Sequence, residues 1–308
     1  MKVFVPMLAS HAKVRDHDLL EKDVRLHLLL EAIVADKTVG PDVFFKGGTC
    51  LIKCYLDYPR FSTDLDFTWR LRHAWRSLGT KPLRRALRPV QRTFLDRLET
   101  HASAQGLRFD EDRDVQYGQS NRMMTVILRY ESILRLPSAV KVQVNFVEPL
   151  LRAARRIEAQ GLLQGGLPVS MNLLDSDLPA RYSRPVLVEA YDPAEILAEK
   201  GRAVLTRTAA KTRDLLDLYL LENRLGLLLE EHREDIVKKT TFSVLAARRY
   251  RDRLAEADQR FDLLLEEDVK PLLLKPIDDA AFESFRVRAI EFFGSIVEEL
   301  RELESKDS

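Results

Sequence analysis

The chain has 308 residues, and its 49 Lys and Arg balance 48 Asp and Glu to leave a formal net charge of +1. This length corresponds to about two ordinary domains, and the balanced charge excludes a uniformly basic protein that coats nucleic acid. Two cysteines four residues apart, Cys50 and Cys54, give no disulfide framework. No apolar run approaches the ~20 residues of a membrane span and no signal peptide is recognisable, so we expect a cytoplasmic protein without a membrane partner.

The first elements predicted along the chain are a helix and a strand. Residues 16–36 repeat apolar side chains with the period of an amphipathic helix. Gly40 and Pro41 stop that helix, and the apolar run at residues 43–45 indicates a short buried strand.

A glycine turn and a pair of carboxylates follow. Residues 47–49, Gly-Gly-Thr, are expected to turn the chain into a helix that runs to about Tyr58, before a proline. Residues 62–69 alternate polar and apolar side chains, which predicts a half-buried strand. Its alternation puts Asp64 and Asp66 on the same face.

The middle of the chain continues this mixed pattern. Residues 82–105 return to helical periodicity, and two alternating stretches, residues 123–130 and 140–146, predict antiparallel strands joined by a turn around Pro137-Ser138. The glycines between residues 161 and 166 are typical of a linker, and residues 186–188 predict another short strand.

The last third of the chain predicts helices. Residues 192–195, Asp-Pro-Ala-Glu, combine a capping residue, a proline at the first helical position and a glutamate at the third. Leucine-rich stripes follow at residues 214–229 and 262–274. We therefore expect an α+β protein, with a mixed-sheet domain with flanking helices over residues 1–190 and a helical domain over residues 191–308.

The order strand, glycine turn, helix, carboxylate pair predicts a nucleotide site. Gly47 and Gly48 at a helix start let main-chain N–H groups approach a phosphate, and Thr49 adds a hydroxyl donor. Asp64 and Asp66 are about 7 Å apart along a strand, so both can reach divalent ions. Each part alone is usually a packing device or a solvated strand face. Together they indicate a triphosphate site beside a magnesium site.

These residues carry a family resemblance. Residues 45–49, FKGGT, and residues 60–67, RFSTDLDF, resemble the AbiEii/AbiGii-type nucleotidyltransferase toxins of the polymerase β-like nucleotidyltransferase superfamily. Further blocks that resemble this family are residues 21–23, 194–200 and 211–218. The resemblance implies a magnesium-dependent transferase, with two ions expected, that moves a nucleotide from an NTP to RNA, with the tRNA 3′ end as the expected acceptor. It also implies the toxin of a type IV toxin–antitoxin system, with an AbiEi-like antitoxin as its partner.

The resemblance also implies roles for individual residues. The residues concerned are Gly47, Gly48, Thr49, Asp64, Asp66, Lys200 and Asp214. The glycines and the threonine would cradle the triphosphate, and Asp64 and Asp66 would hold the metals. Lys200 would contact nucleotide phosphate, and Asp214 would complete the site from the helical domain, although without the family both positions are typical of solvated charges on helices. Ser62 lies on the same strand face and either binds phosphate or satisfies the strand edge.

One departure concerns the third carboxylate that this superfamily commonly carries on an adjacent strand. The matching position here is Gln143, whose amide cannot act as a base. Deprotonation of the acceptor is therefore open between Asp214, Glu148 and polarisation by metal. A weakened NTP-binding or regulatory protein on the same fold is the alternative function, and transfer to a protein or a small molecule is another.

A basic stretch provides the expected contact with RNA. The candidate RNA-binding residues are Arg72, Arg76, Arg84, Arg85 and Arg88. Trp69 and Trp75 lie near its start, a composition suited to phosphate contact and base stacking. A second basic cluster lies between residues 238 and 253. The alternative for both clusters is that they pair with acidic stretches of the chain.

Overall fold

The structure is a computed structural model, and it describes residues 1–70, 75, 78–118, 121–163, 166–207, 211–246 and 273–306. The chain divides into two compact units, Met1–Tyr191 and Asp192–Ser308. This division falls one residue after the domain boundary expected from the sequence.

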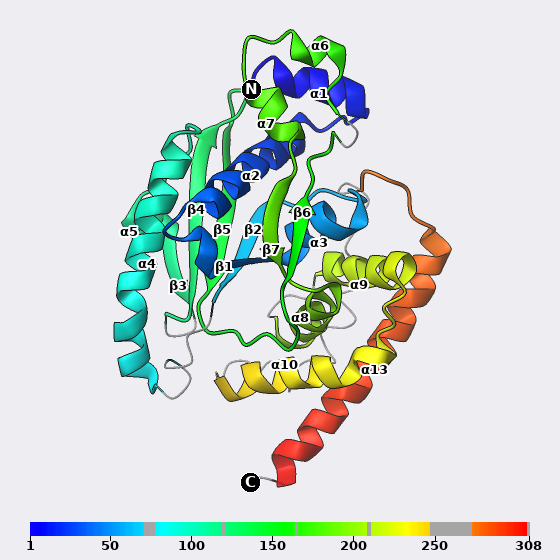
Figure 1. The fold of residues 1–308 in the computed structure, drawn as a ribbon. Coiled ribbons are helices and arrows are strands. Elements are labelled where there is room, and N and C mark those ends of the chain that lie inside the picture. Colours follow the sequence, from blue (N-terminus) through cyan, green and yellow to red (C-terminus); the bar gives the residue numbers. More distant parts are fainter. Residues whose placement is uncertain are drawn as a thin grey trace. The chain divides into compact units, whose positions relative to one another are not determined.

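A mixed sheet forms the centre of the first unit, with strand order β3-β4-β5-β2-β1-β7-β6 in the described part of the chain (Figure 1). The strands are β1 (Val43–Lys46), β2 (Asp64–Trp69), β3 (Val115–Gly118), β4 (Met123–Glu131), β5 (Pro137–Asn145), β6 (Arg155–Ala159) and β7 (Val186–Ala190). β2 pairs with β5 in parallel and β1 with β7 in parallel, whereas the other neighbours are antiparallel. The expected α+β fold with a mixed sheet is confirmed.

The helices of the first unit are α1 (Phe4–Ala12), α2 (His17–Ala35), η1 (Gly40–Asp42), α3 (Gly47–Leu51), the π-helical turn η2 (Ile52–Leu56), α4 (Thr80–Ser103), α5 (Glu111–Asp114), α6 (Val169–Asn172) and α7 (Leu178–Ser183). The two long helices, α2 and α4, are those that the periodicity predicts, whereas α1, α5, α6 and α7 were not predicted. α2 begins where the Asp16 carboxylate accepts from the main-chain N–H of Leu19 at 2.9 Å. The helix after the glycine turn ends earlier than expected, because Asp57 and Tyr58 adopt φ of 52° and 50°.

The predicted antiparallel pair, β4 and β5, is confirmed, but the turn lies elsewhere than expected. Pro137 is the first residue of β5, paired with Glu131, so the connection is made by residues 132–136. The first position of a strand tolerates proline, which lacks an N–H to donate. Sequence reasoning also missed β6, because Arg155, Arg156 and Glu158 interrupt its apolar residues.

The two faces of the sheet differ in what covers them. Leu65, Phe67 and Trp69 of β2 are buried, and the Trp69 ring meets the Phe94 ring of α4 edge-on at 6.2 Å between centroids. α2 packs against β2, β5, β7 and α4, so α2 and α4 form one layer on this face (Figure 1). Strand alternation then directs Asp64 and Asp66 to the opposite face, which we call the open face.

A buried polar cluster holds α2 to its neighbours. Asp23 of α2 pairs with Lys53 Nζ at 2.8 Å and accepts a 2.6 Å hydrogen bond from the Tyr182 hydroxyl. The Tyr58 hydroxyl donates to the same carboxylate at 3.1 Å. Burial, reinforced by Asp23, raises the pKa of Tyr58 and Tyr182, so both phenols remain donors. The cluster fixes η2 and α7 against α2.

Helices make up the described second unit. They are α8 (Pro193–Thr206), α9 (Thr212–Leu225), η4 (Glu230–His232), α10 (Arg233–Ala246) and α13 (Asp279–Lys306). The Asp192 side chain caps α8 by accepting from the Ala194 N–H at 2.8 Å, as its sequence predicts. The leucine-rich stripe expected at 262–274 lies almost entirely outside the described residues. Among the helices described in both units, none combines the length and apolarity that crossing a bilayer requires.

Candidate active site

The glycine turn presses the main chain against one of the two strand carboxylates. Gly47 follows β1 directly and has φ of +77°, a conformation that side chains disfavour. A Cβ at Gly47 would lie 2.4 Å from Asp66 Oδ2, closer than any real contact. This position therefore requires glycine for both its dihedral angle and the approach of Asp66.

Thr49 ties the start of α3 to the start of β2. Its hydroxyl donates to the main-chain oxygen of Asp64 and lies 2.8 Å from Ser62 Oγ. Thr49 is buried, with 1% of its surface exposed. The structure thus brings Thr49, Ser62 and Asp64 together, as the motif predicts. The Thr49 hydroxyl is used in a hydrogen bond to the main chain of β2, the strand that carries the carboxylates.

Asp64 and Asp66 both lie on the open face, and each has a lysine beside it on a neighbouring strand. Lys141 of β5 is in register with Asp64, and its Nζ lies 2.9 Å from Asp64 Oδ2. Lys46 of β1 is in register with Asp66. Sequence reasoning did not assign Lys141 a role, although the alternation of β5 already put it on the same face as Gln143.

The strand register confirms that Gln143 stands beside Asp66, at the place expected for a third carboxylate. Its amide Nε2 donates to the Thr125 hydroxyl of β4 at 2.9 Å. The row across β1, β2, β5 and β4 therefore reads lysine, aspartate, glutamine, threonine. An amide in this row offers no proton acceptor at neutral pH.

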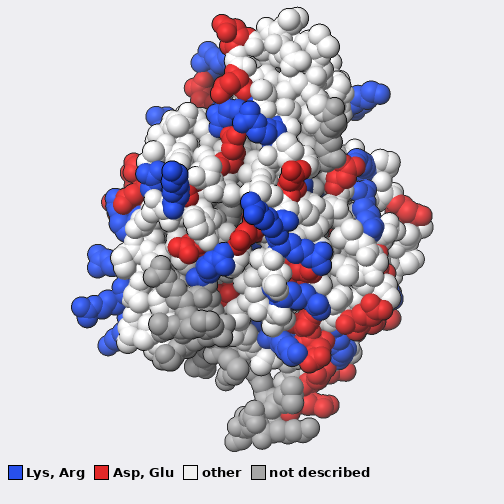
Figure 2. Space-filling view, in the orientation of Figure 1, with Lys and Arg blue, Asp and Glu red and all other residues white. Residues whose placement is uncertain are grey.

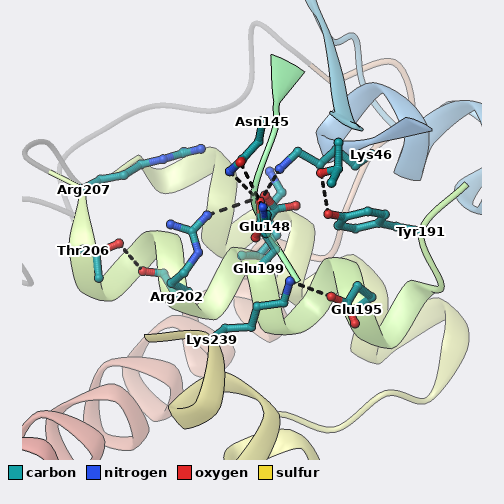
Figure 3. Close-up of polar contacts among 12 residues, drawn as sticks. Lys46, Asn145, Glu148, Tyr191, Glu195, Glu199, Arg202, Thr206, Arg207 and Lys239 are labelled. Atoms are coloured by element: carbon teal, nitrogen blue, oxygen red, sulfur yellow. Dashed lines mark hydrogen bonds and ion pairs between the residues drawn. The ribbon is translucent and has the colours of Figure 1, made fainter. Parts of the chain in front are cut away.

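Glu148 has partners of its own close to this row. Its Oε2 accepts from Lys46 Nζ at 2.8 Å and from Asn145 Nδ2 at 3.1 Å, and Figure 3 shows these three side chains pointing toward one another. The Asn145 side-chain oxygen accepts from the main-chain N–H groups of Val147 and Glu148, each at 3.1 Å. Glu148 is only 4% exposed. Its carboxylate is thus held as one side of a buried ion pair.

In the second unit, Lys200 and Asp214 lie together. Lys200 Nζ is 2.8 Å from Asp214 Oδ1 and 2.7 Å from Asp217 Oδ2, and Arg207 also pairs with Asp214. Burial alone would raise the pKa of Asp214, but the charges of Lys200 and Arg207 outweigh it and lower this pKa to about 2. Asp214 therefore stays ionised at any physiological pH. Neither residue is a solvated charge.

The open face fits a divalent ion that is completed by substrate. Magnesium is usually held by one or two carboxylates together with phosphate oxygens and water, and Asp64 and Asp66 provide that number from one strand. Within the described residues no group of three or more His, Cys, Asp or Glu could enclose a metal. The remaining ligands would have to come from a bound nucleotide and from water.

The candidate RNA-binding arginines are described in part. Arg84, Arg85 and Arg88 are exposed on α4, and Figure 2 shows Lys and Arg side chains along that edge of the molecule. Arg72 and Arg76 lie outside the described residues. The two tryptophans near this stretch, Trp69 and Trp75, are 3% and 8% exposed. The expectation that they offer faces for base stacking is therefore wrong, because both rings are buried.

The sequence as a whole matches a known family. The profile of the family described as "Nucleotidyl transferase AbiEii toxin, Type IV TA system" matches residues 28–295, well over half of the chain. The chain belongs to this family. This AbiEii protein is thus a nucleotidyltransferase toxin of a type IV toxin–antitoxin system, which implies a nucleotide substrate, a divalent metal and an antitoxin partner.

Among solved structures, the fold of the AbiEii chain is similar to that of MenT4, a nucleotidyltransferase toxin from Mycobacterium tuberculosis H37Rv. The TM-score is 0.56 and the sequence identity 21%, over 96% of this chain and 89% of that chain. At this identity the likeness shows a shared fold. No curated protein sequence matches the chain.

Proposed function

We propose that this AbiEii protein transfers a nucleotide from an NTP to the 3′ end of an RNA, with tRNA as its acceptor and two magnesium ions as cofactors. The observation that carries the proposal is the geometry around β2. Asp64 and Asp66 share the open face, and Gly47 brings the start of α3 against Asp66. This arrangement supports the binding of a metal-bound triphosphate at the start of β2.

The residues of the first unit would have three roles: metal binding, phosphate binding and positioning of α3. Asp64 and Asp66 would hold the metal ions, which supply charge stabilisation at the phosphate oxygens when bound. The main-chain N–H groups of Gly47 and Gly48 would face the triphosphate, and Ser62, which lies just before β2, would donate to a phosphate oxygen. Thr49 would act mainly by fixing α3 to β2, since its hydroxyl is used there.

The second unit would contribute Lys200 and Asp214. We propose that Lys200 contacts nucleotide phosphate and that Asp214 and Asp217 hold its ammonium in a fixed orientation. Two carboxylates at 2.8 and 2.7 Å balance the charge of this buried lysine and fix the position of its ammonium. Because the ammonium is already in position before the substrate binds, it can stabilise the reacting phosphates without a rearrangement of the site during the reaction.

The direct test is transfer of label. Purified protein is incubated with tRNA, magnesium and each of the four NTPs labelled at the α-phosphate, and the RNA is resolved on a gel. We expect labelled tRNA with at least one NTP and none with Asp64→Ala, whereas Asp96→Ala on exposed α4 keeps wild-type activity. Absence of label in RNA with all four NTPs would refute RNA as the acceptor, and label in protein or in small molecules would identify another one.

A weakened NTP-binding protein is the second candidate function, and Gln143 is the observation that favours it. Its amide occupies the position beside Asp66 and donates to Thr125. This candidate requires saturable NTP binding without turnover, and expression that does not slow growth. Isothermal titration with a non-hydrolysable NTP, run beside the label assay, separates the two functions.

We further propose that the protein acts in the cytoplasm and that an AbiEi-like antitoxin neutralises it. Induced expression of the wild-type chain should arrest growth, and Asp64→Ala should not. Co-expression of a neighbouring gene for an AbiEi-like protein should restore growth. Growth arrest by Asp64→Ala as strong as that by the wild type would show that transfer is not the cause.

A further inference from the structure

The open face of the sheet continues beyond the carboxylates into a cluster of arginines. Asp64 of β2, Lys141 of β5 and Ile127 of β4 stand in one row across the sheet. Arg129 lies two residues further along β4, opposite Ala139 of β5. Because side chains alternate along a strand, Arg129 projects from the same face as Asp64.

This end of the β4–β5 hairpin contains a cavity of about 490 Å³. Arg108, Arg129 and Arg135 line it, against Glu131 as the carboxylate in the lining. Arg108 belongs to the same face, because it forms an antiparallel bridge to Arg129 with main-chain hydrogen bonds of 3.0 and 2.8 Å. We call Arg108, Arg129 and Arg135 the hairpin arginines.

The partners of the hairpin arginines leave much of their charge available. Arg135 pairs with Glu131 at 3.0 Å, but both side chains are well over half exposed, and such pairs are weak. Arg129 is held by Asp114 at 2.6 Å with its side chain 46% exposed. The exposed Arg108 forms no side-chain ion pair within the described residues. The cavity is therefore an open basic site that can accept an anion.

The spacing between the hairpin arginines and the carboxylates suits a nucleic-acid strand. Two strand separations and two residues of rise put the Cα atoms of Arg129 and Asp64 about 12 Å apart. That span corresponds to about three or four stacked nucleotides at a rise of ~3.4 Å each. Arginine also matches phosphate geometry better than lysine, since its planar guanidinium can donate two hydrogen bonds to one group.

We propose that the hairpin arginines bind backbone phosphates of the acceptor RNA strand, three or four nucleotides from the 3′ end that reacts. This inference rests on the proposed function. It assigns a second RNA-binding surface, besides the candidate RNA-binding arginines of α4. α4 packs through Phe94 on the opposite side of the sheet from Asp64. An RNA strand bound in this way would run along the open face from the hairpin arginines to Asp64.

The test compares variants that each remove two charges. The hairpin variant is Arg108→Gln with Arg135→Gln, which leaves Arg129 and its buried partner Asp114 in place. The α4 variant is Arg84→Gln with Arg88→Gln. A matched control, Lys37→Gln with Arg156→Gln, changes exposed residues at a turn and on the far edge strand β6. Circular dichroism and thermal unfolding check that every variant folds.

Binding of fluorescent tRNA is measured by anisotropy between 50 and 300 mM salt. We expect the hairpin variant to bind about tenfold more weakly at 100 mM salt. Its affinity should also depend less on salt: the negative slope of log K against log salt should become less steep by about 0.7 for each lost phosphate contact. The control variant should match the wild type. The KM for NTP should not change, because the nucleotide site is not altered.

Acceptor length gives a second readout. The hairpin variant should lose transfer efficiency with oligonucleotides longer than about four nucleotides and should equal the wild type with a dinucleotide acceptor. If the wild type labels RNA but the hairpin variant keeps its affinity, salt slope and activity on long acceptors, this inference alone is wrong. If the wild type neither binds nor labels RNA, the RNA acceptor of the proposed function is wrong and this inference fails with it.

Discussion

Lys141 Nζ lies 2.9 Å from Asp64 Oδ2, between two parallel strands whose register sets the residues side by side. A cation thus already stands at one of the two carboxylates proposed to hold magnesium. The side chains are 32% and 19% exposed, so the pair remains accessible to solvent and to ions. A metal that binds Asp64 has to share this carboxylate with Lys141 or displace it.

Removal of this lysine should therefore strengthen metal binding. We expect Lys141→Met to bind Mn²⁺ about two- to fivefold more tightly than the wild type, since a partly exposed ion pair is worth up to about 1 kcal/mol. Lys141→Arg should keep the wild-type affinity, because it keeps the charge. Titration of Mn²⁺ followed by electron paramagnetic resonance, without nucleotide, measures the effect independently of activity. Weaker binding by Lys141→Met would show that the lysine supports the metal site.

Gly47→Ala should displace Asp66. The added Cβ would meet Asp66 Oδ2 at 2.4 Å, and φ is already +77°. Gly106→Ala is the matched control, because Gly106 has φ of +69° but nothing within 4 Å of a Cβ. Both variants should lose about 1 kcal/mol of stability through the backbone, measured by urea unfolding. Only Gly47→Ala should also lose Mn²⁺ binding and transfer, and equal losses in both variants would contradict the contact.

Stability should depend on pH through His27. Burial, followed by the charge of Lys53, lowers the pKa of His27 to about 4 from its usual 6.5. Between these values the unfolded chain binds the proton and the folded chain does not, so stability falls as pH drops from about 6.5 towards 4. The full loss would be about 3 kcal/mol.

Urea unfolding at several pH values between 7 and 4 tests this prediction. His27→Gln should be less stable than the wild type at pH 7, because Gln fills the buried site less well, but its stability should fall less between pH 6.5 and 4.5. Parallel pH profiles of the two proteins would mean that His27 does not titrate in this range.

The second unit contains a buried ion pair, and substitutions of its two residues should have coupled effects on stability. Lys239 Nζ and Glu195 Oε1 lie 2.6 Å apart, and their side chains are 1% and 0% exposed (Figure 3). Glu195→Gln should cost about 3 kcal/mol, because it removes the charge that balances buried Lys239. The double change to Glu195→Leu and Lys239→Met should recover much of this loss in thermal unfolding. A double variant less stable than the single one would contradict the coupling.

Local patterns in the sequence predicted much of the fold and part of the site. The alternation of polar and apolar residues was enough to predict that Asp64 and Asp66 share one face of a strand. The Gly-Gly pair at residues 47–48 was enough to predict the turn at the start of α3. Lys141 could not be assigned to Asp64 in the same way, because the pairing joins strands 77 positions apart in the chain and depends on register. The exposure of Trp69 was predicted wrongly because the basic stretch begins directly after it, at Arg70, whereas in the fold its ring packs against Phe94.

The placement of α4 behind the sheet has a consequence for how the transferase can be switched off. Asp64, Arg129 and Arg108 lie on one face of the sheet, while α4 covers the other face through its contact with Trp69. A protein that inhibits by covering the carboxylates must dock on the strand side. One that docks on α4 would leave the carboxylates uncovered and could act only by changing the shape or dynamics of the first unit.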